Sequence, residues 1–229
     1  MGAERPMRIK ISGIQNEAEM KIAVNCGADA IGFLVGQLHR ASSFILPSSA
    51  ARLAAMLPPY VCPVIVTHLT EAEQIMDILR RADIYTVQIC GSITVPEIEK
   101  LSGIMPKHGK IILTAYINIQ NVIPSLDDYF GRIAAVTFDC FNRSPAHVGG
   151  SEANSHKWEA VSAFMKKCPL PVILAGALSP ENVGDAVQTF KPFGVDACSA
   201  LKNPLTGDLI EEKCRAFIAT ARRASLPPL

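Results

Sequence analysis

Eight short apolar segments recur along the chain, and longer stretches of mixed polarity separate them. The segments are rich in isoleucine and valine, as is typical of parallel strands that are buried on both faces. The expected strands are Met7–Ser12, Ala28–Val35, Val61–Thr67, Ile84–Cys90, Lys110–Tyr116, Ile133–Asp139, Pro171–Gly176 and Gly194–Ser199.

The stretches between these segments have the periodicity of helices. Asn16 precedes Glu19 by three residues and Thr70 precedes Glu73 by three, which is the capping-box spacing of a helix start. Eight strands alternating with about eight helices predict a parallel sheet with right-handed crossovers. We expect this sheet to close into a single (β/α)8 TIM barrel, with an open doubly wound sheet as the alternative.

The composition fits one globular domain. The chain has 229 residues and no low-complexity linker, so residues 1–229 are expected to form one barrel with residues 1–6 as a short leader. A net charge of +1 offers no basic surface for nucleic acid. No apolar run reaches the roughly 18 residues of a membrane span. Seven cysteines without a CxxC spacing indicate reduced thiols and a cytoplasmic location.

Reactive groups of such barrels lie at the carboxyl ends of the strands and in the loops that follow. The side chains at these positions should therefore share one mouth. They are Ser12, His39, Arg40, Thr67, His68, Gln88, Cys90, Asp139, Ala175–Ala177 and Asp196–Ala200.

Several motifs in chain order resemble one enzyme family. They are Lys10–Ile14 (Lys-Ile-Ser-Gly-Ile), Gly27–Phe33, Val87–Gly91, Val148–Ser151, Leu174–Val183 and Pro192–Asp196. Together they resemble the phosphoribosylanthranilate isomerases of tryptophan biosynthesis, over nearly the whole chain. The resemblance implies a (β/α)8 barrel that acts on a phosphorylated sugar without a metal or an organic cofactor.

The family's reaction is an Amadori rearrangement, in which an acid opens a furanose ring and a base removes the C2 proton. The resemblance implies that Asp139 is the acid and that Ser12 occupies the position of a cysteine base. A cysteine with an ordinary pKa of about 8.5 can be tuned into a thiolate near neutrality, whereas a serine alkoxide needs a strong neighbouring base. Ser12 alone is therefore expected to be a poor base.

The resemblance also implies the substrate contacts. Ser43 occupies the position of an arginine that holds the anthranilate carboxylate, and Arg40, three residues earlier, is the expected replacement. Asp196 is expected to contact the substrate. A phosphate site is expected in the loops after the sixth, seventh and eighth strands, where backbone N–H groups and small residues allow close approach. Its members are Gly150, Gly176, Ala177 and Ser199.

Two other functions stay open at this point. One is a divergent paralogue with a different reaction, which includes a zinc-assisted one if His39, His68 and Cys90 meet. The other is a protein that binds a phosphorylated ligand without turnover. A metal is not expected, and neither is a nucleic-acid or membrane partner. The chain is expected to be a monomer or a homodimer.

Overall fold

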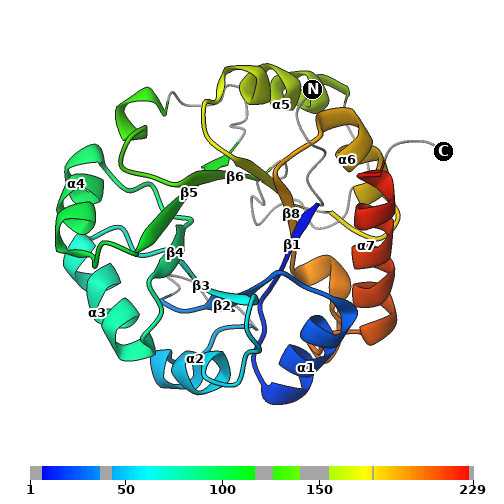
Figure 1. Cartoon of the computed structure of the whole chain (residues 1–229), viewed down its shortest axis with the longest axis horizontal. Coiled ribbons are helices and arrows are strands. Elements are labelled where there is room, and N and C mark those ends of the chain that lie inside the picture. Colours follow the sequence, from blue (N-terminus) through cyan, green and yellow to red (C-terminus); the bar gives the residue numbers. More distant parts are fainter. Residues whose placement is uncertain (1–6, 37–42, 117–125, 140–154, 177, 227–229) are drawn as a thin grey trace.

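The computed structural model describes residues 7–36, 43–116, 126–139, 155–176 and 178–226. Eight parallel strands close into a barrel in the order β1 to β8, and the helices surround it (Figure 1). The predicted (β/α)8 barrel is thus confirmed, and the alternative of an open sheet is wrong. The strands are β1 (Arg8–Ser12), β2 (Ala30–Leu34), β3 (Cys62–Thr67), β4 (Thr86–Ile89), β5 (Lys110–Tyr116), β6 (Ala135–Asp139), β7 (Val172–Ala175) and β8 (Gly194–Ala197).

Outside the connection between β5 and β6, each strand is followed along the chain by an α-helix. The α-helices of the described residues are α1 (Glu17–Cys26), α2 (Pro47–Ala54), α3 (Ala72–Ala82), α4 (Val95–Ile104), α5 (Ser155–Lys167), α6 (Val183–Phe190) and α7 (Glu211–Ala224). Between β5 and β6 the described part of the connection holds a 3-10 turn, η1 (Asp127–Tyr129), where an eighth helix was expected. None of the described helices is long and apolar enough to cross a membrane.

The predicted helix starts are right for α1 and wrong for α3. The Asn16 side chain caps α1, since its Oδ1 accepts a hydrogen bond from the Glu19 amide at 3.0 Å. Helix α3 begins at Ala72, so Thr70 is not its cap. The carboxylate of Glu97 in α4 accepts the Ala72 amide at 2.6 Å, so a neighbouring helix supplies the acceptor that the local sequence does not.

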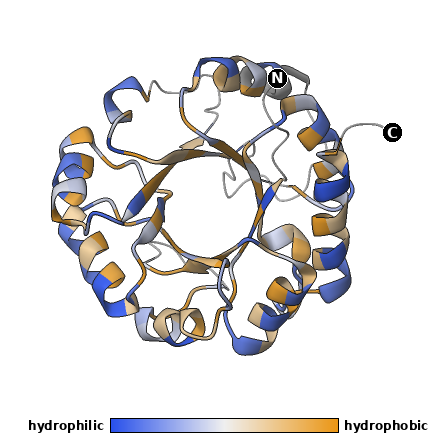
Figure 2. Cartoon of the chain, viewed as in Figure 1, coloured by the Kyte–Doolittle hydropathy of each residue, from blue (hydrophilic) through white to orange (hydrophobic). Residues whose placement is uncertain are grey.

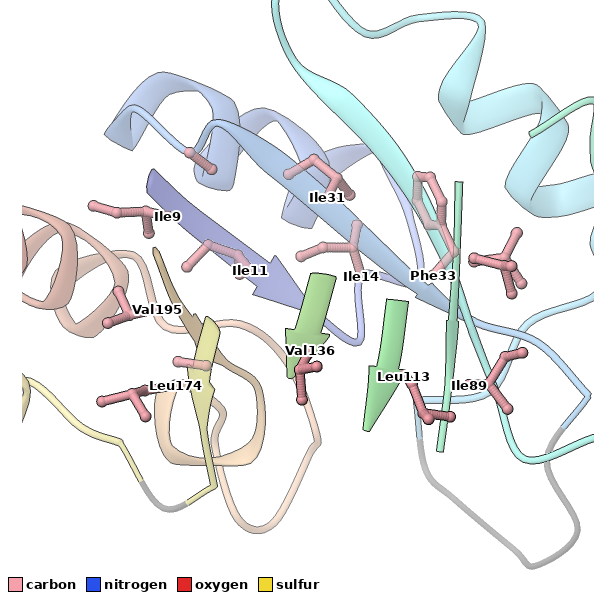
Figure 3. Close-up of a cluster of buried hydrophobic side chains, with 14 of the residues drawn as sticks. Ile9, Ile11, Ile14, Ile31, Phe33, Ile89, Leu113, Val136, Leu174 and Val195 are labelled. Carbon is pink, nitrogen blue, oxygen red and sulfur yellow. The ribbon is translucent and has the colours of Figure 1, made fainter. Parts of the chain in front are cut away.

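The strands carry their apolar side chains mainly on the outer face of the barrel. Ile9 and Ile11 of β1 and Val195 of β8 belong to the main hydrophobic cluster (Figure 3). The ring of Phe138 in β6 stacks on the ring of Phe164 in α5, with 4.9 Å between the ring centroids. Hydrophilic segments lie on the helices of the outer ring (Figure 2). The layer between the strands and the helices is therefore the hydrophobic core.

The inner face of the barrel carries buried polar side chains as well. Successive side chains of a strand point to opposite faces, so the residues that alternate with the core positions point inward. Those that are polar or charged and buried are Lys10, Ser12, Gln88, Thr114, Thr137 and Asp196. The interior of this barrel thus depends on hydrogen bonds and charge pairing as well as on apolar packing.

A buried charge pair joins α1 to the segment that follows β8. The Lys202 ammonium lies 3.2 Å from Glu19 Oε1, and both side chains are buried. The same carboxylate accepts hydrogen bonds from the Gln15 and Leu209 amides, each at 2.9 Å. Glu19 therefore fixes the start of α1 and the chain after the eighth strand relative to each other.

We expect Lys202→Met to lower the free energy of unfolding by about 3–5 kcal/mol, because it leaves the Glu19 carboxylate charged and without its cation. The double variant Lys202→Met/Glu19→Gln should recover part of this loss. Urea denaturation of the two variants and the wild type measures both effects. A single variant that loses less than about 1 kcal/mol would contradict the importance of the pair.

Two threonines that pair in register provide a matched test of the polar interior. Thr114 and Thr137 are register partners on β5 and β6. The Thr114 hydroxyl accepts from Gln88 Nε2 at 3.3 Å, whereas the buried Thr137 hydroxyl has no hydrogen-bond partner among the described residues. A buried polar group without a partner destabilises a protein, and removing one member of a pair does so too.

We therefore expect Thr137→Val to raise the free energy of unfolding by about 1 kcal/mol and Thr114→Val to lower it by about 1–2 kcal/mol. Thermal and urea denaturation, run side by side, measure the difference. Equal effects of the two substitutions would show that the hydrogen bonds of the interior do not govern its stability.

Candidate active site at the mouth of the barrel

The centre of the candidate site is the contact between Ser12 and Asp196. Ser12 is the last residue of β1, and Asp196 lies in the neighbouring strand β8 (Figure 1). The Ser12 hydroxyl donates to Asp196 Oδ1 at 2.7 Å, and the Lys10 ammonium lies 2.9 Å from Asp196 Oδ2. The three residues are 4%, 7% and 5% exposed, respectively. Each oxygen of the carboxylate thus has its own donor in a site shielded from water.

This contact continues across the barrel as a polar network. Lys10 also donates to Gln88 Oε1 on β4. The amide nitrogen of Gln88 then donates to the Thr114 hydroxyl at 3.3 Å and lies 3.7 Å from Cys90 Sγ. The network therefore connects β8 and β1 with β4 and β5. In it, both the oxygen and the nitrogen of the Gln88 side-chain amide have hydrogen-bond partners.

Gly32 leaves the space in which the Ser12 hydroxyl lies. The two residues are register partners on β2 and β1. A Cβ atom added to Gly32 would lie 2.4 Å from Ser12 Oγ and 3.1 Å from Ser12 Cα. Any side chain at residue 32 would therefore displace Ser12.

Gly13 brings two further side chains to the end of β1. Its φ angle is +78°, and a Cβ atom here would lie 2.6 Å from Cys198 Sγ and 3.3 Å from Ser43 Cβ. The backbone thus turns tightly against both residues directly after Ser12. Ser43, at the expected arginine position, is buried against this turn.

The two thiols near the mouth are poor proton acceptors. Removal from water raises the pKa of Cys90. Burial, and next to it the Asp196 carboxylate, raises the pKa of Cys198 to about 11. Both groups are therefore neutral thiols near pH 7, and neither replaces a thiolate base.

Asp139 ends β6 and is half-buried, between its register partners Tyr116 on β5 and Ala175 on β7. The Tyr116 hydroxyl donates to the Cys90 carbonyl oxygen at 3.1 Å. Burial is the main cause that raises the pKa of Tyr116, so its phenol is neutral near pH 7. Asp139 thus has an uncharged polar neighbour at the mouth.

Several expected site residues lie elsewhere or are not described. Thr67 does not line the mouth, because its hydroxyl donates to the Gly36 carbonyl and accepts from the Leu69 amide, each at 3.2 Å, and so holds the loop after β3. Gly176 follows directly after β7, which ends at Ala175, and has a φ angle of +79°. Ser199 opens the 3-10 turn η2 (Ser199–Leu201) instead of ending a strand. The residues outside the described part are His39, Arg40, Gly150 and Ala177.

No three histidine, cysteine, aspartate or glutamate side chains of the described residues lie together as a metal site. The zinc hypothesis included His39, which lies outside this part of the chain. Lys10 and Gly32 lie in the sequence motifs, but neither is among the site residues predicted from the sequence. Lys10 stands two residues before Ser12 in an apolar strand, so alternation alone could have assigned it to the same inner face.

Comparison with known proteins gives a family and several relatives. The family pattern described as N-(5'phosphoribosyl)anthranilate (PRA) isomerase matches residues 9–218. The N-(5'-phosphoribosyl)anthranilate isomerase 2 of Methanosarcina mazei is 36% identical over 197 residues, which are 86% of each chain. The N-(5'-phosphoribosyl)anthranilate isomerase of Halobacterium salinarum is 30% identical over 222 residues, or 97% of this chain and 99% of the relative.

Solved structures share the fold over the same length. The phosphoribosylanthranilate isomerase of Thermotoga maritima superposes with a TM-score of 0.77 at 26% identity, covering 95% of this chain and 99% of the other. A further isomerase of this kind, solved with reduced 1-(o-carboxyphenylamino)-1-deoxyribulose 5-phosphate, has a TM-score of 0.75 at 24% identity, with the same shares covered.

The geometry around Gly32 predicts a specific cost. Gly32→Ala should lower the free energy of unfolding by about 1–3 kcal/mol, because its methyl group collides with Ser12. Gly103→Ala is the matched control, since a Cβ atom there meets nothing within 4 Å, and it should stabilise α4 by about 0.5–1 kcal/mol. Denaturation curves compare the two variants, and a Gly32→Ala protein as stable as the wild type would refute the packing.

Proposed function

The chain belongs to the N-(5'-phosphoribosyl)anthranilate isomerase family, and we propose that it is an isomerase that converts an N-phosphoribosyl arylamine into the corresponding 1-deoxyribulose 5-phosphate. The observation that carries this proposal is the family match over residues 9–218, which includes Ser12 and Asp139 at the ends of their strands. The barrel mouth is where enzymes of this fold hold their reacting groups.

Asp139 is the general acid of this proposal. Its protonated carboxyl donates to the ring oxygen of the furanose while the bond between C1 and that oxygen breaks, which leaves an iminium at C1. Its position at the end of β6, where this fold holds its reacting groups, and its half-buried state support the role. The nitrogen of the substrate serves as the electron sink, so this chemistry needs no metal.

The phosphate of the substrate is proposed to bind beyond β7 and β8. Gly176 has a left-handed backbone that L side chains rarely adopt, and it follows directly after the last residue of β7. Ser199 follows β8 at the same end of the barrel. Backbone N–H groups in such loops are suited to phosphate oxygens. Gly150 and Ala177 complete the proposed site, with Arg40 proposed to contact the arylamine carboxylate.

Steady-state kinetics on phosphoribosylanthranilate test the function. We expect measurable turnover by the wild type and a loss of about 10²–10⁴-fold in Asp139→Asn, because the asparagine cannot donate the proton that opens the ring. Binding of the reduced product analogue to both proteins, measured by calorimetry, separates lost chemistry from lost binding. A wild-type protein that binds the analogue without any turnover would refute the isomerase and favour a binding protein.

A further inference from the structure

We propose that Ser12 and Asp196 remove the C2 proton as one unit, in which the Ser12 oxygen receives the proton and passes its own to Asp196. This inference rests on the proposed isomerase function. It gives Asp196 a part in proton transfer, beyond the substrate contact expected from the sequence.

The direction of the hydrogen bond supports this unit. Ser12 has one hydroxyl proton, and it is directed to Asp196 Oδ1 at 2.7 Å. The lone pairs of Ser12 Oγ are therefore free to accept a proton from another direction. Gly32 borders the hydroxyl without a side chain, so no side chain from β2 covers Ser12 Oγ on that side.

The Asp196 carboxylate is held in the orientation that the transfer needs. The Lys10 ammonium binds Oδ2 at 2.9 Å and also donates to Gln88 on the opposite side of the barrel. Because Lys10 occupies Oδ2, the carboxylate presents Oδ1 to Ser12. The carboxylate and its two donors are buried, so bulk water does not compete for the hydroxyl.

The other described groups near Ser12 are less suited to accept the proton. Removal from water raises the pKa of Cys90, and burial raises that of Cys198 to about 11, so both are neutral thiols near pH 7. Lys10 forms an ion pair with the Asp196 carboxylate. Asp139 is the proposed acid. Among the described groups at this side of the mouth, Asp196 is the remaining carboxylate, and Ser12 connects it to the substrate.

The step balances as follows. The C2–H bond of the iminium breaks, and its electron pair forms the C1=C2 double bond while the iminium nitrogen becomes neutral. A new O–H bond forms at Ser12 Oγ as the original Ser12 O–H bond breaks, and that proton forms an O–H bond at Asp196 Oδ1. In the tautomerisation to the ketose, Asp196 returns its proton to Ser12 and Ser12 Oγ gives a proton to C1, so that both groups are restored. The O–H bond at C2 breaks as the C2=O double bond forms, and that proton restores the carboxyl of Asp139.

A double-variant cycle tests whether the two residues act together. We expect Ser12→Ala and Asp196→Asn each to reduce kcat by about 10²–10⁴-fold, and the double variant to be no slower than the slower single variant. Deuterium at C2 of the substrate should slow the variants more than the wild type, because proton removal has become rate-limiting. Thr137→Val, also an inner-face substitution, is the control that should keep the wild-type rate.

Stability and binding measurements keep the outcomes separate. If Asp196→Asn does not fold because Lys10 loses its partner, Lys10→Met/Asp196→Asn removes the charges together and takes its place in the cycle. The reduced product analogue should still bind to each variant, as measured by calorimetry. Loss of this binding with an unchanged kcat in Asp196→Asn would make Asp196 a substrate contact and overturn the inference.

Two further results would overturn it while leaving the isomerase function in place. One is a wild-type rate in Ser12→Ala, and the other is a double variant whose loss is the product of the single losses. A wild-type protein without turnover would instead refute the proposed function, and the unit with it. Joint losses that do not multiply, together with the larger isotope effect, would support the unit.

Discussion

The buried ion pair between Lys10 and Asp196 is the interaction on which the inner face of the barrel depends. Two charges taken out of water destabilise a fold unless good geometry and further hydrogen bonds satisfy them. Here the carboxylate receives one donor at each oxygen, and the ammonium has Gln88 as a second acceptor. The pair therefore determines where the polar side chains of β1, β4 and β8 lie, and with them the hydroxyl of Ser12.

The main hydrophobic core and the proposed reacting groups occupy different layers of this molecule. The apolar side chains that pack against the helices, such as Ile11 and Phe138, lie on the outer face of the strands. The inner face carries the charges and hydroxyls, which end at the mouth in Ser12 and Asp139. Substitutions on the inner face can therefore change the reacting groups while the main hydrophobic core stays intact, as expected of a fold that hosts many chemistries.

The surroundings of Ser12 suit the role proposed for it. A serine needs a neighbouring acceptor where a cysteine could act through its own thiolate, and the Asp196 carboxylate lies at that distance. The absence of a side chain at Gly32 gives the hydroxyl its space, and the tight turn at Gly13 brings Cys198 and Ser43 against the same strand end. The proposed base thus has both space for its hydroxyl and a polar partner.

The sequence by itself determined the eight strands and the residues that end β1, β3, β5 and β6, because the apolar runs are local properties. The predicted ends of β2, β4, β7 and β8 lie one or two residues beyond the observed ones. The sequence also placed Ser12 and Asp139 at strand ends. Only the tertiary structure decided that Ser12 meets Asp196, 184 residues away, since barrel closure brings β8 beside β1 in one register. The cap of α3 by Glu97 and the burial of Lys202 against Glu19 were decided in the same way. These contacts depend on which elements become neighbours, and no local pattern contains that information.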